Sequence, residues 1–291
     1  MIPSTVDEVQ AALAEQQYVA DRTLAVSIHL AIQMGRPLFL EGEAGVGKTE
    51  VSKVLSRILD AELIRLQCYE GLDVSQALYE WDYARQMLAI RLLEAGGEHA
   101  AVADIMSRDY LIARPLLRAV EEAAAGRRPV LLIDELDRAD EEFEAYLLEL
   151  LSDFQVTIPE VETVKAKVPP VVVVTSNRTR EIHDALKRRC IYHWIDYPDF
   201  DREVEILSRK APEVPSELAA ELARAMQRLR GLDLFKPPGV AETLDWASAL
   251  VVLGRDHLTV EAAEETLGVI LKYQEDIDRV RGGGVSEIVV G

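Results

Sequence analysis

Residues 42–49 have the sequence GEAGVGKT, which matches the phosphate-binding pattern G-x-x-x-x-G-K-[ST] at every specified position. The glycines Gly42 and Gly47 let the backbone turn so that its N–H groups face a phosphate. Lys48 supplies positive charge for the β- and γ-phosphates, and Thr49 supplies a hydroxyl for Mg²⁺. ATP with Mg²⁺ is therefore the first ligand that the sequence predicts.

The segments on either side of this loop distinguish a phosphate site from a chance glycine-rich turn. Residues 36–42 (RPLFLEG) predict a short buried strand, and the apolar residues between 51 and 59 recur with the spacing of one helix face. A strand before the loop and a helix after it are the required context, because the helix directs its positive end at the anion. We expect the following residues to contact the nucleotide: Gly42, Glu43, Ala44, Gly45, Val46, Gly47, Lys48, Thr49 and Glu50.

A second motif lies in the segment VLLIDELDRAD, residues 130–140. An apolar strand ends there in two acids, Asp134 and Glu135. Asp134 is placed to hold Mg²⁺ together with Thr49, and Glu135 is placed to polarise an attacking water. A solvated strand end is the simpler interpretation, but the phosphate loop upstream makes the catalytic one stronger.

A third apolar segment, VVVVTS, is followed by Asn177. In a parallel sheet the ends of such strands meet at one edge, where Asn177 could orient the attacking water or reach the γ-phosphate. Asparagine after a strand is more often a turn residue, so this motif is weak by itself.

The chain divides into two parts by its pattern of segments. Strand-like and helical segments alternate up to about residue 198, and only helical segments follow. We therefore expect an α/β domain with a parallel sheet over residues 1–198 and a helical domain over 199–281. Gly282 to Gly284 predict a flexible tail from 282 to 291, and β-branched residues around a turn predict a hairpin at about 155–168.

Composition narrows the classes of function. The chain has 32 Lys and Arg against 51 Asp and Glu, a formal charge of −19, which argues against tight non-specific DNA binding. Two cysteines, Cys68 and Cys190, are too few for a disulfide framework, and no ligand spacing accompanies them. The sequence shows neither a signal peptide nor an apolar run long enough to span a membrane. We expect a cytoplasmic protein without an integral membrane segment.

Taken in order, the phosphate loop, the acid pair and Asn177 resemble Walker A, Walker B and sensor 1 of the AAA+ ATPases, and the resemblance covers nearly the whole chain. It implies a five-stranded parallel sheet of order 5-1-4-3-2 and a helical lid over the nucleotide. It also implies that protomers assemble into rings, most often hexamers.

Within AAA+, three segments resemble the MoxR group. They are FLEGEAGVGKTEVSK around the loop, the hairpin expected before sensor 1, and an insert in the second helix at about 69–92. The segments ALYEWDYARQM and LKRRCIYHWIDYP are more similar still to the CoxD-like branch. That resemblance implies an ATP-hydrolysing chaperone for maturation of a molybdenum hydroxylase, working with a von Willebrand factor A domain partner.

The basic run Lys187-Arg188-Arg189 precedes the fifth expected strand. Cations suit the end of a helix, which is the simplest interpretation. The resemblance instead implies that an arginine here reaches the ATP of the neighbouring protomer as an arginine finger. Arg189 is the first candidate and Arg188 the second, and Lys187 is expected at the surface.

The lid departs from the family pattern. Val240, Ala241 and Glu242 stand where many AAA+ proteins carry the sensor 2 arginine, and Lys236 lies upstream. This departure leaves open a nucleotide-gated switch with very slow turnover. A DNA-remodelling motor is disfavoured by the charge.

An aromatic and acidic cluster, Tyr79 to Tyr83, falls within the insert. Its tyrosines and Trp81 either pack into the core or contact a client, and the sequence does not decide between the two.

Overall fold

Three strands are buried along their whole length: β1 (Leu38–Gly42), β5 (Val130–Asp134) and β8 (Val171–Ser176). Strands that are almost entirely apolar on both faces belong to a sheet covered by helices, as expected for a parallel sheet. The computed structural model describes residues 3–96, 105–159 and 161–290.

The main sheet has five strands. β2 (Leu63–Gln67) lies at one edge and β9 (Ile191–Ile195) at the other, in the order β2-β5-β8-β1-β9. Counted along the chain these are strands 2-3-4-1-5, so the expected order 5-1-4-3-2 is confirmed. The pairs β1–β8, β2–β5 and β5–β8 are parallel.

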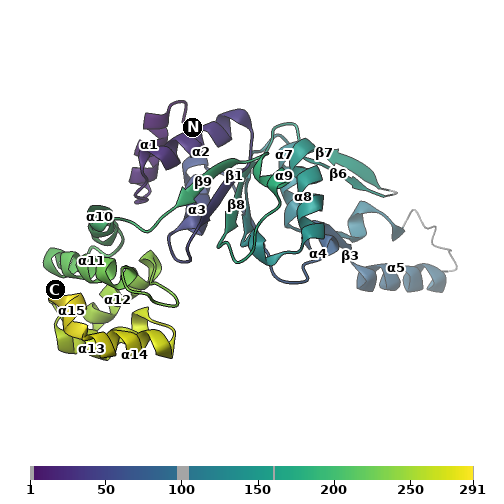
Figure 1. Cartoon of the computed structure of the whole chain (residues 1–291). Helices are drawn as coiled ribbons and strands as arrows, with labels where there is room; N and C mark the ends of the chain where they lie inside the picture. Colours follow the sequence, from purple (N-terminus) through teal and green to yellow (C-terminus); the bar gives the residue numbers. More distant parts are fainter. Residues whose placement is uncertain (1–2, 97–104, 160, 291) are drawn as a thin grey trace. The chain divides into compact units, whose positions relative to one another are not determined.

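An apolar core joins the sheet to helices α7 (Pro115–Ala124) and α8 (Glu141–Asp153), which lie beside the sheet in Figure 1. Phe39 and Val174 of the sheet meet Leu117 and Phe143 of these helices in that core. The helices along this part of the chain are α1 (Val6–Glu15), α2 (Arg22–Met34), α3 (Lys48–Leu59), α7 (Pro115–Ala124), α8 (Glu141–Asp153) and α9 (Asp184–Lys187).

The expected insert contains both helix and strand. α4 (Val74–Leu78) leads into β3 (Tyr79–Trp81), and α5 (Tyr83–Ala95) follows. β3 pairs antiparallel with β4 (Leu111–Ala113), which comes after the short helix η1 (Arg108–Tyr110). This ribbon was not expected from the sequence. Each of its strands has only three residues, too few for a clear alternating pattern.

A second ribbon precedes β8. Its strands β6 (Gln155–Ile158) and β7 (Glu162–Lys165) pair antiparallel, with Val156 opposite Val164. Both of these valines are buried, so one face of the ribbon packs on the α/β core.

The C-terminal part is helical around a fully buried Trp246, whose indole N–H donates to Thr266 Oγ1 at 2.7 Å. Its helices are α10 (Phe200–Lys210), α11 (Ser216–Arg230), α12 (Val240–Val252), α13 (Val260–Ile270), α14 (Gln274–Gly283) and α15 (Val285–Val289). The expectation of a flexible tail from residue 282 was wrong. Val285 and Ile288 are buried in this core, and the burial of both side chains holds α15 in place.

Contacts between residues divide the chain into two compact units. The first contains the segments up to Val9, Thr23–Glu41 and Ser52–His193, and the second contains Gln10–Arg22, Gly42–Val51 and the chain from Trp194 onward. The phosphate loop is thus grouped with the C-terminal helices, so these units differ from a simple division at residue 198. Among the described residues, no helix is long and apolar enough to cross a membrane.

Candidate nucleotide site

The strand register brings the polar ends of the strands together at one edge of the sheet. Gln67 on β2 is opposite Asp134 on β5, and Glu41 on β1 is opposite Ser176 on β8. Gly42, the first residue of the phosphate loop, follows Glu41 directly. Asp134 therefore lies at this edge, and Glu135 and Asn177 follow directly after β5 and β8.

Asp134 is buried, and both of its carboxylate oxygens accept hydrogen bonds. Its side chain is only 2% exposed. Thr175 Oγ1 donates to Oδ1 at 2.7 Å, and Arg65 on β2 donates to Oδ2 from Nη2 at 2.6 Å and from Nε at 3.1 Å. Arg65 was not singled out in the sequence, because an arginine in an edge strand normally indicates only a solvated face.

Glu135 lies in the left-handed region of backbone space, with φ of 55°. Its N–H donates to Thr175 Oγ1 at 2.9 Å, which helps to hold this uncommon conformation. Its carboxylate contacts Gln67 Nε2 at 3.1 Å and Arg138 Nε at 3.1 Å. A hydrogen bond of 3.4 Å from Asn177 Nδ2 also brings the expected base and the expected sensor together.

Asp137 fastens the loop that carries Asn177. Its carboxylate accepts the N–H of Asn177 at 3.1 Å, and the N–H and hydroxyl of Thr179 at 2.9 and 2.7 Å. Burial alone would raise the pKa of Asp137, but these hydrogen bonds outweigh burial and hold the pKa below its ordinary value. Sequence reasoning missed this residue, although the segment DELD places a third acid two residues after the acid pair.

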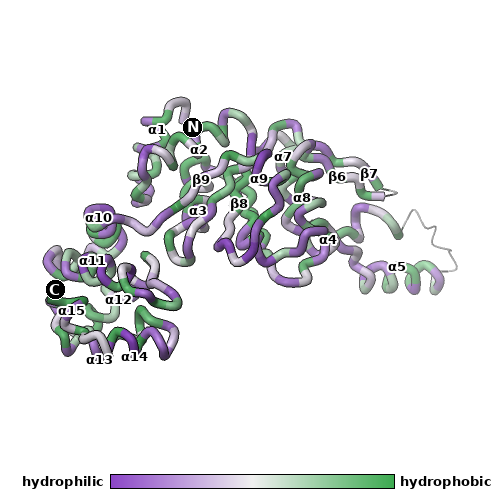
Figure 2. The backbone as a smooth tube through the Cα atoms, viewed as in Figure 1, coloured by the Kyte–Doolittle hydropathy of each residue, from purple (hydrophilic) through white to green (hydrophobic). Residues whose placement is uncertain are grey.

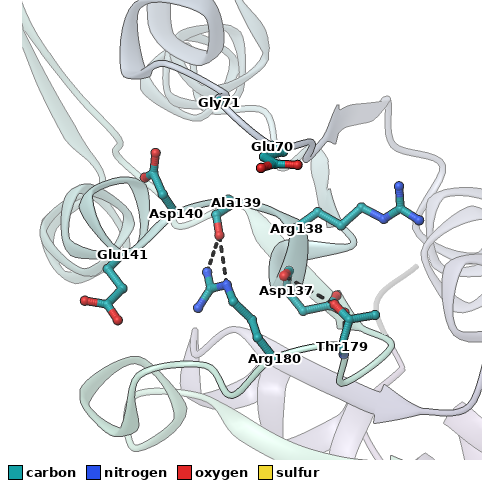
Figure 3. Close-up of a pocket in the computed structure, with 9 residues that line it drawn as sticks. All are labelled: Glu70, Gly71, Asp137, Arg138, Ala139, Asp140, Glu141, Thr179 and Arg180. Atoms are coloured by element: carbon teal, nitrogen blue, oxygen red, sulfur yellow. Dashed lines mark hydrogen bonds between the residues drawn. The ribbon is translucent and has the colours of Figure 1, made fainter.

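A cavity of about 670 Å³ opens beside Asp137 (Figure 3). It lies where the segments after β2, β5 and β8 meet, and in Figure 3 Arg180 points at the carbonyl of Ala139 while Thr179 bonds to Asp137. The residues around it are Glu70, Gly71, Asp137, Arg138, Ala139, Asp140, Glu141, Thr179 and Arg180. Arg138 connects this cavity to Glu135, the expected base.

The phosphate loop has the conformation that its glycines predict. Gly45 and Gly47 have φ of +76° and +94°, a region that other residues rarely adopt. Lys48 is buried, and its ammonium donates to the carbonyls of Gly42 at 2.7 Å and Glu43 at 2.6 Å. The amino group is thereby held over the loop at the start of α3.

The other side chains of the phosphate loop and the start of α3 differ in exposure. Val46 is buried and Glu43 is exposed, whereas Ala44, Thr49 and Glu50 are partly buried. Glu50 forms an ion pair of 3.7 Å with Lys210 on α10, so it is tied to the helical part of its own unit.

The start of α12 packs directly on the phosphate loop. The Ala241 N–H donates to the carbonyl of Gly45 at 3.2 Å, and a side chain at Gly239 would come within 2.7 Å of the Ala44 carbonyl oxygen. The segment expected to carry sensor 2 thus reaches the loop without an arginine at 240–242. Arg230 nearby is committed to the buried Glu203, with two bonds of 2.7 Å.

The protein groups fit Mg²⁺, which prefers oxygen ligands and keeps several waters. The Thr49 hydroxyl and the Asp134 carboxylate each offer an oxygen of this kind. In the described ranges, no group of three His, Cys, Asp or Glu side chains could hold a metal by itself.

The basic run is not uniformly at the surface. Lys187 was expected there, but its side chain is 28% exposed and forms an ion pair of 3.4 Å with Glu41, which is 4% exposed. A buried carboxylate needs such a counter-charge, which explains the difference. Arg188 is 82% exposed and lies 4.0 Å from Asp184, whereas Arg189 donates to the Leu148 carbonyl at 2.5 Å.

Residues 37–190 match the family model described as the AAA domain of the dynein-related subfamily. The match covers just over half of the chain and contains the phosphate loop, the acid pair, Asn177 and the basic run. The chain belongs to this AAA family. The AAA domain places it among the P-loop ATPases, proteins that bind nucleotides and commonly form rings.

Three individual proteins that resemble this AAA protein share at most 24% of its sequence. An uncharacterized protein of Staphylococcus epidermidis is 24% identical over 255 residues, which cover 85% of this chain and 88% of that protein. A point variant of Thermotoga maritima RuvB matches with a TM-score of 0.51 and 18% identity, covering 95% of this chain and 76% of RuvB. A Cytophaga hutchinsonii protein provisionally described as an ATPase has a TM-score of 0.50 and 17% identity, covering 98% of this chain and 92% of that one. At such identities the two structures show the shared fold alone.

Proposed function

We propose that this AAA protein hydrolyses ATP, with the phosphate loop binding the nucleotide and the acid pair serving the metal and the attacking water. The observation that carries the proposal is the placement of Asp134, Glu135 and Asn177 at the sheet edge where β1 enters the loop. Lys48 binds the β- and γ-phosphates, and Thr49 and Asp134 hold Mg²⁺. When bound, the metal neutralises charge that develops on the transferred phosphoryl group.

In this proposal Glu135 is the general base that orients and deprotonates the attacking water. Asn177, bonded to the same carboxylate, helps to position that water. The carboxylate accepts a hydrogen bond from Gln67 and pairs with Arg138, so these contacts have to loosen before its oxygens can face the attacking water.

The proposed working unit is a ring of this chain, most simply a hexamer. An arginine of the basic run would then reach the neighbour's γ-phosphate, where its planar fork matches the phosphate oxygens. Exposure supports Arg188, whose side chain is 82% exposed, whereas the family pattern supports Arg189, which is bonded to Leu148. Both remain candidates for the finger.

Helix α5 supports a role in binding another protein, because it buries a polar side chain and exposes apolar ones. Gln86 is buried and donates to the Ile105 carbonyl at 2.8 Å, whereas Tyr83, Leu88 and Leu92 are 70%, 59% and 65% exposed. Figure 1 shows α5 projecting from the sheet beyond β3, and apolar and polar residues alternate along it in Figure 2. An exposed apolar surface on a projecting helix is typical of a docking surface.

We propose that the client is a metalloenzyme, specifically a molybdenum hydroxylase undergoing maturation of its active site. The supports are the MoxR and CoxD-like resemblance of the insert and the basic run, together with the exposed face of α5. A von Willebrand factor A domain protein would deliver the client, and the complex would work in the cytoplasm. Within the aromatic cluster, Tyr79 and Trp81 of the β3–β4 ribbon pack against the core, whereas Tyr83 is exposed. Of these three aromatic residues, we therefore assign client contact to Tyr83.

The experiment that tests this function compares the hydroxylase from cells with and without this protein. Hydroxylase that is inactive and lacks its complete molybdenum and sulfur content in the deletion strain is the expected result. Metal- and sulfur-complete hydroxylase from that strain would refute the client assignment, while leaving ATP hydrolysis to be measured separately on the purified protein.

A nucleotide-gated switch is the second candidate. It is favoured by the absence of an arginine at 240–242 and by the bonds that engage both acids. A steady-state rate above roughly one ATP per minute per protomer would exclude it, because slow intrinsic switches turn over far less often.

A further inference from the structure

Arg65 and Asp134 form an ion pair between neighbouring strands in the first unit. The guanidinium places Nη2 at 2.6 Å and Nε at 3.1 Å from the same carboxylate oxygen, Oδ2. The other oxygen, Oδ1, accepts the hydroxyl of Thr175 at 2.7 Å. Oδ2 is therefore the oxygen on which the two bonds from Arg65 converge.

The two partners differ sharply in exposure. The Arg65 side chain is 53% exposed, whereas that of Asp134 is 2% exposed. A buried carboxylate without a counter-charge is costly, so the positive charge of Arg65 stabilises Asp134 when no metal is present. The exposed guanidinium loses little on leaving, because water can solvate it at once.

A metal ion at Asp134 would meet the guanidinium at the same carboxylate. Two cations drawn to one oxygen repel each other, and the divalent ion is held more strongly than the monovalent one. Binding of one therefore weakens binding of the other, although a carboxylate has enough lone pairs to hold both briefly.

From this geometry, and resting on the proposed function, we infer that Arg65 is a built-in counter-cation that competes with Mg²⁺ for Asp134. It holds the carboxylate in place before the nucleotide arrives, and it is displaced when the metal–nucleotide complex binds. Arg65 thereby sets how strongly nucleotide affinity depends on Mg²⁺. It is a positioning residue and takes no part in the chemical step.

The test measures the affinity of a fluorescent ATP analogue in EDTA and in Mg²⁺, and takes the ratio of the two dissociation constants. In Arg65→Gln the dissociation constant in EDTA divided by that in Mg²⁺ should be about tenfold larger than in the wild type, which corresponds to about 1.4 kcal/mol. The affinity in EDTA should be nearly unchanged. Arg65→Lys keeps the charge and should stay within about threefold of the wild type. Arg118→Gln is the matched control, because Arg118 is similarly exposed at 51% and paired with Glu62, and it should change nothing.

A second arm asks whether Arg65 acts through Asp134. In an Asp134→Asn background, Arg65→Gln should no longer alter the ratio, because the carboxylate for which Arg65 and Mg²⁺ compete is absent. Direct titration with Mn²⁺ followed by electron paramagnetic resonance should show the same tightening in Arg65→Gln at saturating nucleotide.

An unchanged or smaller Mg²⁺ gain in folded Arg65→Gln protein would overturn the inference, since Arg65 would then assist the metal or play no part. The same holds if the effect persists in the Asp134→Asn background. Wild-type protein that binds no nucleotide in either buffer would instead refute the proposed function, and this inference with it.

Discussion

The amide of Asn177 and the carboxylate of Glu135 are joined by a hydrogen bond of 3.4 Å, although 42 residues separate them in the chain. Asn177 follows β8 and Glu135 follows β5, and these two strands are neighbours in the sheet. The parallel topology thus brings together the proposed base and the proposed sensor. It also makes their roles separable by single substitutions.

Glu135→Gln should abolish hydrolysis while leaving nucleotide binding intact. Removing a general base costs about 10²- to 10⁴-fold in rate, whereas the amide keeps the size and most hydrogen bonds of the side chain. Phosphate release and equilibrium binding of labelled ATP measure the two properties separately. Equal loss of both would show that Glu135 supports the fold of the site and does not act on water.

Arg188→Ala and Arg189→Ala should differ, because only one of these residues supplies the finger. The finger variant should bind ATP normally, hydrolyse it at least about 10³-fold more slowly and regain activity when mixed with Glu135→Gln protomers. Arg279→Ala, at an exposed ion pair with Asp233, is the control. If neither mixture regains activity while rings still form, the basic run does not act across the subunit interface.

Arg230→Ala should destabilise the C-terminal helices strongly. Arg230 is 7% exposed and Glu203 is fully buried, so truncation leaves a buried carboxylate unpaired at a cost of about 3–5 kcal/mol. Arg255→Ala breaks a half-exposed pair with Glu265 and should cost less than about 1 kcal/mol. Urea unfolding of both variants measures the difference, and equal costs would contradict this account of the pair.

Asp137→Asn should weaken the loop that carries Asn177 in a pH-dependent manner. The pKa of Asp137 is lowered in the folded state, so its contribution to stability is present above its unfolded pKa of about 4 and is lost as pH falls through the folded value. The stability gap between wild type and variant should therefore be about 1–3 kcal/mol at pH 7 and shrink as pH falls below about 4. Exposed Asp245→Asn should show no such gap, and a gap independent of pH would exclude the ionised carboxylate as its source.

Leu88→Ser combined with Leu92→Ser should spare ATP hydrolysis and impair client activation. Both side chains are mostly exposed on α5, so their loss removes contact surface without opening a cavity. Val252→Ser, at a residue 85% exposed on α12, controls for general loss of surface hydrophobicity. Client activation that survives the double substitution would show that α5 is not the docking surface.

Much of the fold was accessible from the sequence because local patterns carry it. The loop 42–49 and the apolar runs before Asp134 and Asn177 identified the central strands, and the family resemblance that those three segments carry implied the strand order. The ribbon β3–β4 was missed because its pairing joins segments about 30 residues apart. The last helix was missed because three glycines favour a flexible tail unless tertiary contacts bury the side chains after them.

The sequence pointed to Asp134, Glu135 and Asn177 as site residues, but not to the residues that contact them. Arg65, Gln67 and Asp137 act through contacts with residues far along the chain, and nothing in their immediate sequence indicates these partners. Lys187 was expected at the surface because three basic residues in a row favour solvent. Its partner Glu41 is 146 residues away, and only the folded sheet brings the two together.

The most direct test of the central claim reconstitutes client activation with purified components. Immature molybdenum hydroxylase, the proposed client, is incubated with this protein, the proposed von Willebrand factor A domain partner, Mg²⁺ and ATP, and hydroxylase activity is followed over time. The account predicts activation by the wild-type protein with ATP, and none by Glu135→Gln protein that still binds ATP. Equal activation by both proteins, or by neither, would contradict it.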